Sequence, residues 1–276
     1  MASAAKGEKR HEEDVADRVA PPGEVIYEAI YREGAHELKR ENGALALSGL
    51  AAGLSMGFSF LTEGLLRGIL PQAVWTPAVA KLGYAVGFVI VILGRQQLFT
   101  KNTLTIILPL LNRRGGTPAR LTDVARLWAI ILAANLCGAA AFAGVMKIPG
   151  LFSPETHDAF NAIGTEALSG SFTLILIRSI LAGWLIALMI WLLPFAESAR
   201  LWVISGLAYV VGIGHLPHVV AGSVSTVYAV FSGDITFGRY LAGFLAPALL
   251  GNAIGGVALV AVGAHAEFVE EGGQKK

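Results

Sequence analysis

The chain has 276 residues, of which 54% are hydrophobic and 15% are charged; its mean hydropathy is +0.61 and its net charge is +1. Soluble domains carry about 25% charged residues, so this composition excludes an ordinary soluble protein, and the near-neutral charge gives no indication of nucleic-acid binding. The single cysteine, Cys137, excludes an intrachain disulfide and a multi-cysteine metal cluster.

The N-terminal part divides into two segments. Residues 1–20 are polar and charged, which predicts a disordered cytoplasmic tail, and they lack the apolar core of a signal peptide. Residues 21–41 predict a helix whose apolar side chains, between Val25 and Ile30, share one face. We expect this amphipathic helix to lie along the membrane surface; an ordinary solvated helix is the alternative.

Six apolar segments follow, and a crossing of about 30 Å of hydrocarbon needs about 20 such residues. We place them near residues 43–70, 78–111, 122–147, 170–194, 199–231 and 238–264. Residues 42–266 therefore predict an all-α membrane domain of six spans, followed by a tail over 267–276. In the first span, Gly49, Gly53 and Gly57 recur every fourth residue, which favours close approach of another helix.

The distribution of basic residues predicts the orientation, because cytoplasmic loops are enriched in Lys and Arg. One side carries more of them, namely Arg32, Lys39, Arg40, Arg113, Arg114, Arg120, Arg200, Lys275 and Lys276. The other side has Arg67, Lys81, Lys147 and Arg239, and an acidic loop after the third span. We expect both termini to be cytoplasmic, which requires an even number of spans.

Two of the spans are interrupted. The second contains Gly94, Arg95, two glutamines and further polar residues up to Asn102, and the fifth contains glycines, two histidines and Pro217 between residues 212 and 222. Unpaired backbone groups in lipid cost several kcal/mol, so breaks of this kind line a protein-enclosed or water-filled cavity. The two interruptions therefore predict the walls of a pore.

The two halves of the chain repeat this pattern. Asn135 follows Thr100 by 35 residues, Asn252 follows His218 by 34, and each asparagine begins an N-x-x-G sequence. Three spans per half give the halves opposite orientations, as in transporters whose paired broken helices enclose the site near the midplane. Half-helix N-termini favour anions, and Thr100 and Asn102 could cap the half-helix after the first break.

These motifs carry a resemblance to the formate/nitrite transporter family over residues 21–268. The matching residues are Leu98-Phe99-Thr100 with Asn102-Thr103, Asn135-Leu136-x-Gly138, the histidine-bearing break, and Pro247-x-x-x-Gly251-Asn252-x-x-Gly255-Gly256. The resemblance implies an aquaporin-like protomer, a homopentamer in the lipid of a prokaryotic inner membrane, and formate or nitrite as cargo. It implies neither an enzyme nor a cofactor.

The resemblance also assigns site residues. Leu98, Phe99 and Thr100 correspond to the family's constriction loop, and Tyr84 to a constricting aromatic. His218 is the preferred counterpart of the family's pore histidine, with His215 as the alternative. Several family residues differ here: Gly214 and Pro217 stand where an acidic residue is expected, Gly183 replaces a span-four asparagine, and no lysine lies between the third and fourth spans. The chain therefore resembles a divergent branch.

Each candidate residue has a physical role and an ordinary alternative. His218 could share a proton with a weak acid, because histidine titrates near neutrality, or it could be a hydrogen-bonded packing residue. Arg95 could attract anions within the first break, whereas Arg178 favours an interfacial position or an acidic partner. Glu63 and Arg67, four residues apart, predict a structural ion pair. We expect Asn135 and Asn252 to fix helix contacts by hydrogen bonds.

The leading hypothesis is passage of a small monovalent anion or its weak acid, with a proton link through a pore histidine as part of the hypothesis. A neutral-solute or water pore of the same fold is the first alternative, and a transport-inactive scaffold or sensor is the second. A membrane enzyme with His215 and His218 as metal ligands is disfavoured, because Pro217 separates them and no nearby cysteine or acid completes a metal site.

Overall fold

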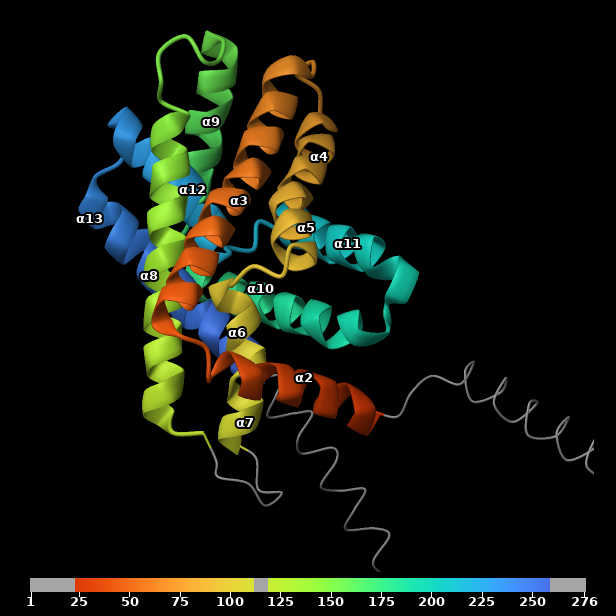
Figure 1. Cartoon of the computed structure of the whole chain (residues 1–276). Coiled ribbons are helices and arrows are strands. Elements are labelled where there is room, and N and C mark those ends of the chain that lie inside the picture. The colour runs from red at the N-terminus through yellow and green to blue at the C-terminus, as the bar shows by residue number, and fades with distance from the viewer. Residues whose placement is uncertain (1–22, 112–118, 259–276) are drawn as a thin grey trace, which may run out of the picture.

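The computed structural model describes residues 23–111 and 119–258, and these residues form helices and connecting loops without a β-strand (Figure 1). The prediction of an all-α chain is therefore confirmed. The predictions for the N-terminal tail, for Arg113 and Arg114, for the end of the sixth span and for the C-terminal tail lie outside the described residues.

The helices follow the predicted segments in order. The first half contains α2 (Gly23–Glu37), α3 (Asn42–Ile69), α4 (Thr76–Ala80), η1 (Lys81–Tyr84), α5 (Ala85–Leu93), α6 (Phe99–Thr105), α7 (Ile107–Leu111) and α8 (Leu121–Val145). The second half contains α9 (Pro154–Glu166), α10 (Phe172–Leu192), η2 (Leu193–Phe195), η3 (Glu197–Ala199), α11 (Arg200–Ile213), α12 (Val219–Ser232), α13 (Phe237–Arg239) and η4 (Tyr240–Leu245), a π-helical turn that continues as helix to residue 258.

Within residues 23–111 and 119–258, five helical runs are long and apolar enough to cross a membrane, namely 42–69, 76–93, 121–145, 172–195 and 237–258. The predicted fifth span falls on α11 and α12, two 14-residue helices that are each shorter than a crossing. Both predicted breaks are confirmed, between α5 and α6 and between α11 and α12. The count of six spans thus depends on joining the two short helices into one crossing, and it stays a prediction.

The segment expected to be an acidic loop after the third span is instead the helix α9. Ser153 begins this helix, because its Oγ accepts a hydrogen bond from the Thr156 N–H over 3.3 Å, and Pro154 occupies the first helical position. Both start signals are present in the sequence, but the low hydropathy of the segment sets it apart from the predicted spans. The helix matters for the site because it ends at Glu166.

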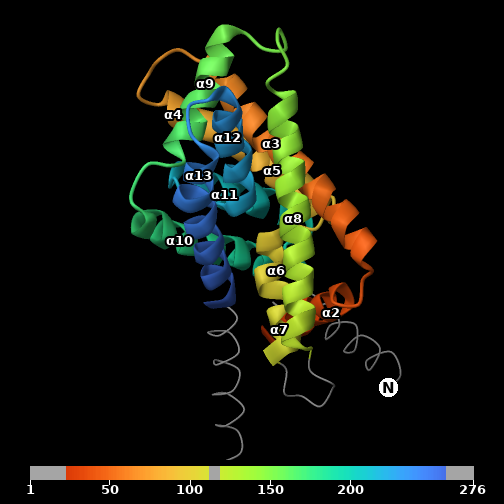
Figure 2. The same cartoon turned by 90° about the vertical axis from the view of Figure 1, so that its left-hand side faces the viewer.

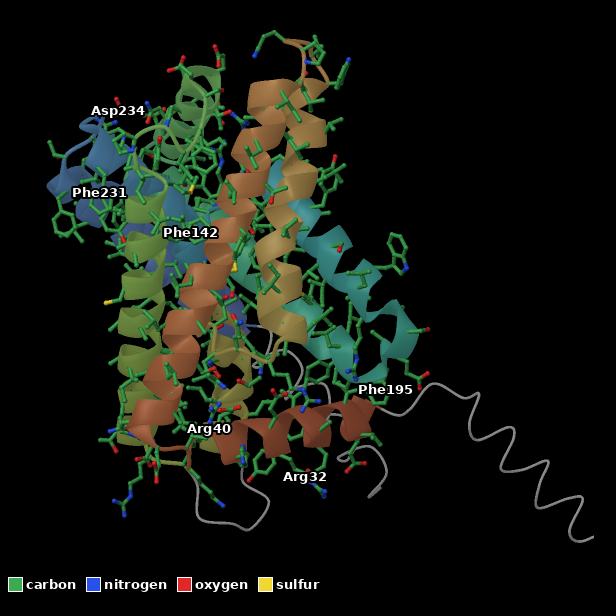
Figure 3. The ribbon with its side chains drawn as sticks, turned by 45° about the horizontal axis from the view of Figure 1, so that its top comes forward. Arg32, Arg40, Phe142, Phe195, Phe231 and Asp234 are labelled. Atoms are coloured by element: carbon green, nitrogen blue, oxygen red, sulfur yellow. The ribbon has the colours of Figure 1, made fainter. Side chains whose placement is uncertain are left out.

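The two half-helices after the breaks lie in opposite halves of the molecule. Both views show α6 and α7 beside one end of the long helix α8, and α12 towards its other end, as an inverted repeat requires (Figures 1 and 2). The helix α2 crosses the end occupied by α6 and α7 (Figures 1 and 2). Figure 3 shows Arg32 and Arg40 at this end of the molecule and Asp234 far from them.

Close helix contacts at glycines hold each half together, as the glycine spacing of the first span predicts. A Cβ atom added to Gly53 of α3 would overlap the backbone oxygen of Asn135 in α8. In the second half, a Cβ atom added to Gly183 of α10 would overlap the backbone oxygen of Asn252. The helix pairs α3–α8 and α10–residues 246–258 are therefore equivalent contacts in the two repeats.

Replacing Gly53 by alanine is expected to destabilise the protein by about 1–3 kcal/mol, because the added methyl group meets backbone rather than a flexible side chain. Gly206 of α11 has nothing within 4 Å of an added Cβ atom, so Gly206→Ala should be neutral or stabilising by up to about 1 kcal/mol. Thermal unfolding in detergent would compare the two, and equal melting temperatures would contradict the packing argument.

Candidate functional site

The first break joins α5 to α6 through a strained turn. Arg95 has a positive φ of 50°, which is unusual for a residue with a side chain. The extended residue Leu98 then begins α6 without a side-chain cap. Asn135 from α8 replaces that cap: its Oδ1 accepts from the Phe99 N–H over 2.9 Å, and its Nδ2 donates to the carbonyls of Gly49 and Gln97, both over 2.8 Å.

The second break repeats this geometry. His215 has a φ of 48°, as Arg95 does in the first break, and His218 is the extended residue before α12. Asn252 accepts from the Val219 N–H over 2.8 Å and donates to the carbonyls of Ser179 (2.8 Å) and Pro217 (2.9 Å). Each break is therefore satisfied by an asparagine from the third helix of its own half.

These contacts test the predicted roles of the two asparagines and the predicted cap of the first half-helix. The prediction that Asn135 and Asn252 fix helix contacts by hydrogen bonds is confirmed. The prediction that Thr100 and Asn102 cap the half-helix is wrong, because both residues lie inside α6. The Asn102 amide instead donates back to the Gln97 side chain over 2.9 Å and to the Leu98 carbonyl over 3.1 Å.

Thr100 and His218 join the two breaks at the centre of the molecule. Thr100 Oγ1 lies 2.6 Å from His218 Nε2, and the two residues are 0% and 1% exposed. His218 Nδ1 accepts a hydrogen bond from the Ala221 N–H over 3.1 Å, so this nitrogen carries no proton. In the neutral ring the proton therefore lies on Nε2, which donates to the threonine hydroxyl.

Apolar and aromatic side chains surround this pair. Leu98 and Phe99 are buried beside Thr100, and Phe99 packs edge-on against Trp128 of α8 with 5.6 Å between ring centroids. Phe88 packs edge-on against the His218 ring at 5.0 Å, and Tyr84 packs against Phe88 at 5.4 Å. The polar contact between the half-helices is thus enclosed in an apolar environment, which strengthens its electrostatic interactions.

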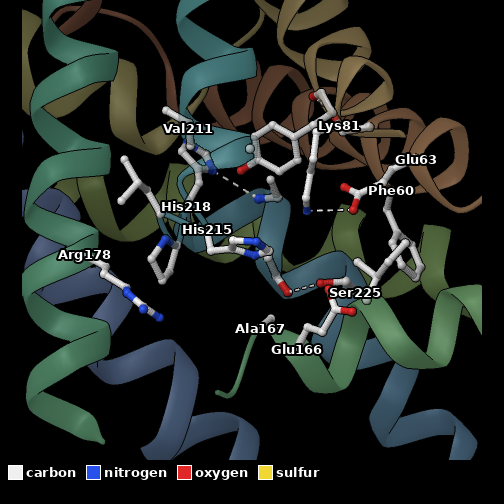
Figure 4. Close-up of a pocket in the computed structure, with 18 of the residues that line it drawn as sticks. Phe60, Glu63, Lys81, Glu166, Ala167, Arg178, Val211, His215, His218 and Ser225 are labelled. Atoms are coloured by element: carbon white, nitrogen blue, oxygen red, sulfur yellow. Dashed lines mark hydrogen bonds and ion pairs between the residues drawn. The ribbon is translucent and has the colours of Figure 1, made fainter. Parts of the chain in front are cut away.

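A pocket on one side of this pair, here named the α10 pocket, contains His215 as well as His218. Its walls come from α3, η1, α9, α10 and the second break, and its charged or titratable lining residues are Glu63, Lys81, Tyr84, Glu166, Arg178, His215 and His218. In the view of Figure 4, Arg178 lies on one side, Glu63 with Lys81 on the other, and His215 between them.

Ion pairs balance most of the charge in the α10 pocket. Glu63 Oε1 lies 2.7 Å from Lys81 Nζ and 3.2 Å from Arg67 Nη2, which confirms the predicted Glu63–Arg67 pair. Arg67 also donates two hydrogen bonds to Glu166, over 2.8 and 2.9 Å. Burial alone would raise the pKa of the Glu166 carboxyl, but the hydrogen bonds and charge of Arg67 outweigh it and hold this pKa below its usual value.

A second pocket, here named the α2 pocket, lies beside the first break. Arg95, Lys101, His36 and Arg200 line it together with Glu33 and Glu37 of α2. Lys101 Nζ forms an ion pair with Glu33 over 2.5 Å, whereas Arg95 and Arg200 are exposed. Arg95 and His215 therefore occupy equivalent positions in the two breaks, but they line different pockets.

The sequence-predicted residues thus fall into two groups. Leu98, Phe99, Thr100, Tyr84 and His218 lie around the contact between the breaks, and Asn102 lies two residues further along α6. Arg95 and His215 line two different pockets. Sequence reasoning missed Lys81 and Glu166 as pocket residues, because they were weighed only as markers of membrane orientation. Among the residues described, no group of three His, Cys, Asp or Glu side chains could hold a metal ion.

Known proteins resemble this chain over most of its length. The sequence model of a family described as formate/nitrite transporter matches residues 24–266, nearly the whole chain. The chain belongs to the formate/nitrite transporter family. One relative is the inner membrane protein YfdC of Escherichia coli K12, which is 35% identical to this chain over 260 residues. The match covers 94% of this chain and 83% of YfdC.

A more distant relative and two solved structures extend the comparison. A probable formate transporter of Methanothermobacter thermautotrophicus is 24% identical over 242 residues, covering 79% of this chain and 86% of its own length. A solved pentameric formate channel with formate bound has a TM-score of 0.70 at 18% identity, covering 83% of this chain and 98% of its own. A solved FNT family ion channel reaches 0.76 at 19% identity, covering 88% and 98%. These structures share the fold with this chain.

Proposed function

We propose that this protein carries a small monovalent anion, or its weak acid, across a prokaryotic inner membrane, with the route passing between Thr100 and His218. The observation that carries this proposal is the contact between the two breaks. The His218 ring donates to the Thr100 oxygen, so the threonine O–H proton is left to donate elsewhere, and within the described residues no acceptor takes it. An anion beside Thr100 would accept that proton.

The charges of the two pockets support an anion over a cation. Arg178 in the α10 pocket, and Arg95 and Arg200 in the α2 pocket, form no ion pair with any acid in the described part of the chain. Basic groups at both sides of a narrow apolar passage raise the local concentration of anions. The positive N-terminal end of α12 acts in the same direction at the centre.

Formate and nitrite are the cargo we propose first, and a homopentamer is the proposed assembly. Family membership and the shared fold with a pentameric formate channel support both. Formate and nitrite are planar oxyanions small enough to accept one hydrogen bond from Thr100 and leave. Each protomer would hold its own route, since both breaks come from one chain.

The hydrogen bond from the Ala221 N–H to His218 Nδ1 limits how His218 could take part in proton coupling. A proton relay through the ring would need His218 Nδ1 to take up a proton, and the Ala221 N–H already donates to that nitrogen. Relay therefore requires the first turn of α12 to open. We propose that His218 serves as a fixed donor to Thr100 and that any proton crosses as part of the weak acid.

Flux measurements in proteoliposomes test this proposal. Formate, nitrite and glycerol uptake would be measured across pH 5 to 8, with protein-free liposomes as the control. We expect formate and nitrite uptake above the control and no glycerol uptake. Glycerol uptake without anion uptake would replace the proposal with a neutral-solute pore, and no uptake of any solute would favour a transport-inactive scaffold.

A further inference from the structure

Among the charged residues that line the α10 pocket, Arg178 is the one that lies inside the long apolar helix α10. It lies seven residues into α10, within the run 172–195 that is long and apolar enough to cross a membrane. A charged side chain inside such a run is costly to insert into a membrane, so it ordinarily faces a partner or a cavity. Arg178 is partly buried and lines the cavity that His215 and His218 also line.

The neighbouring acids do not neutralise Arg178. Glu63 is shared by Lys81 and Arg67, and Glu166 receives both of its hydrogen bonds from Arg67. These two acids and two bases balance one another. The structure pairs Arg178 with neither acid, nor with any other residue among 23–111 and 119–258. One positive charge is therefore left over in the cavity.

We infer that Arg178 is a substrate-binding residue that selects planar oxyanions such as carboxylates before they reach Thr100 and His218. The guanidinium is planar and presents parallel N–H groups, which match the two oxygens of a carboxylate or of nitrite. A spherical halide can meet the charge but cannot use both donors in this way. Arg178 thus supplies a preference for oxyanions over chloride that the single hydrogen bond from Thr100 does not supply.

The position of Arg178 relative to the breaks supports this role. His218 lines the same cavity, so an anion held by Arg178 is already in the space that leads to the Thr100 contact. The α2 pocket has no counterpart inside a long span, because Arg95 and Arg200 are exposed residues at a break and at a helix start. The inference rests on the proposed function for its meaning in transport, but binding at Arg178 can be measured without transport.

The test uses the purified full-length protein and sodium formate as the probe, at constant ionic strength. Isothermal titration calorimetry would give the dissociation constant for formate and for chloride in wild type, R178Q, R178K and R239Q. Arg239 is an exposed arginine of α13 that does not line the cavity, so R239Q is a matched loss of charge. Thermal unfolding would show that each variant is folded, and R178K retains the charge should R178Q fail to fold.

We expect R178Q to weaken formate binding at least tenfold, R178K to bind formate and chloride with similar affinity, and R239Q to match wild type. Formate affinity unchanged in R178Q, or formate preference retained in R178K, would overturn the inference. Flux measured in parallel separates the two proposals. Wild-type flux with binding insensitive to R178Q defeats only the inference, whereas Arg178-dependent binding without wild-type flux defeats only the transport proposal.

Discussion

Replacing Thr100 by valine is expected to lower formate flux by about tenfold or more while leaving the protein folded. Valine has the shape of threonine but no hydroxyl, so the buried N–H of His218 loses its acceptor and the anion loses its donor. An unsatisfied buried polar group costs about 1–3 kcal/mol, and about 1.4 kcal/mol in a barrier corresponds to tenfold in rate. Initial formate uptake in proteoliposomes measures the effect.

Thr105→Val is the matched control for Thr100→Val. Thr105 is also buried in α6, but its hydroxyl donates within its own helix, to Lys101 O over 3.4 Å and to Asn102 Oδ1 over 3.2 Å. Its replacement should leave flux within about twofold of wild type. Equal loss in the two variants would mean that the hydroxyl of Thr100 has no special part in transport.

The substitution His218→Asn tests the other residue of the Thr100–His218 hydrogen bond. Asparagine is a favoured residue at the position before a helix, so it should preserve the start of α12 that His218 now provides through Ala221. Its side chain is shorter than that of histidine, so the bond to Thr100 should be lost. We expect flux to fall as in Thr100→Val with little change in melting temperature, and wild-type flux in this variant would argue against a route beside His218.

The largest effect on folding is expected for Asn135→Leu and Asn252→Leu. Each asparagine makes two hydrogen bonds to backbone groups at a helix break and one to a carbonyl of a neighbouring helix, and leucine makes none. At about 1–3 kcal/mol for each unsatisfied group, the loss approaches the 5–15 kcal/mol by which proteins are ordinarily stable. We expect little or no monodisperse protein by size-exclusion chromatography of a fluorescent fusion.

Asn161→Leu is the control for those two variants. Asn161 of α9 is partly exposed, and its side chain accepts one hydrogen bond, from the Ser232 hydroxyl over 2.8 Å. Its replacement should reduce the melting temperature slightly and leave the yield near that of wild type. Normal yield and melting temperature for Asn135→Leu would show that water or other groups satisfy the first break.

Features that depend on local composition could be predicted from the sequence. The apolar runs predict helices, the two interruptions predict breaks, and the glycine spacing of the first span predicts a close helix contact. Each of these properties follows from neighbouring residues along one segment. The nearly equal spacing from each break to Asn135 and Asn252 also predicted the inverted repeat. Even the Glu63–Arg67 pair was accessible, since its members are one helical turn apart.

The partners of buried groups could not be predicted, because they come from distant segments. Thr100 and His218 are 118 residues apart, and only the packing of the two halves brings them within 2.6 Å. The cap of α6 comes from Asn135 in another helix rather than from Thr100 or Asn102 nearby. The sequence context of Arg178 predicted an acidic partner or an interfacial position. In the structure, the nearby acids Glu63 and Glu166 instead form ion pairs with Arg67 and Lys81. The sequence by itself thus determined a family and two broken helices, and the fold decided which side chains meet between them.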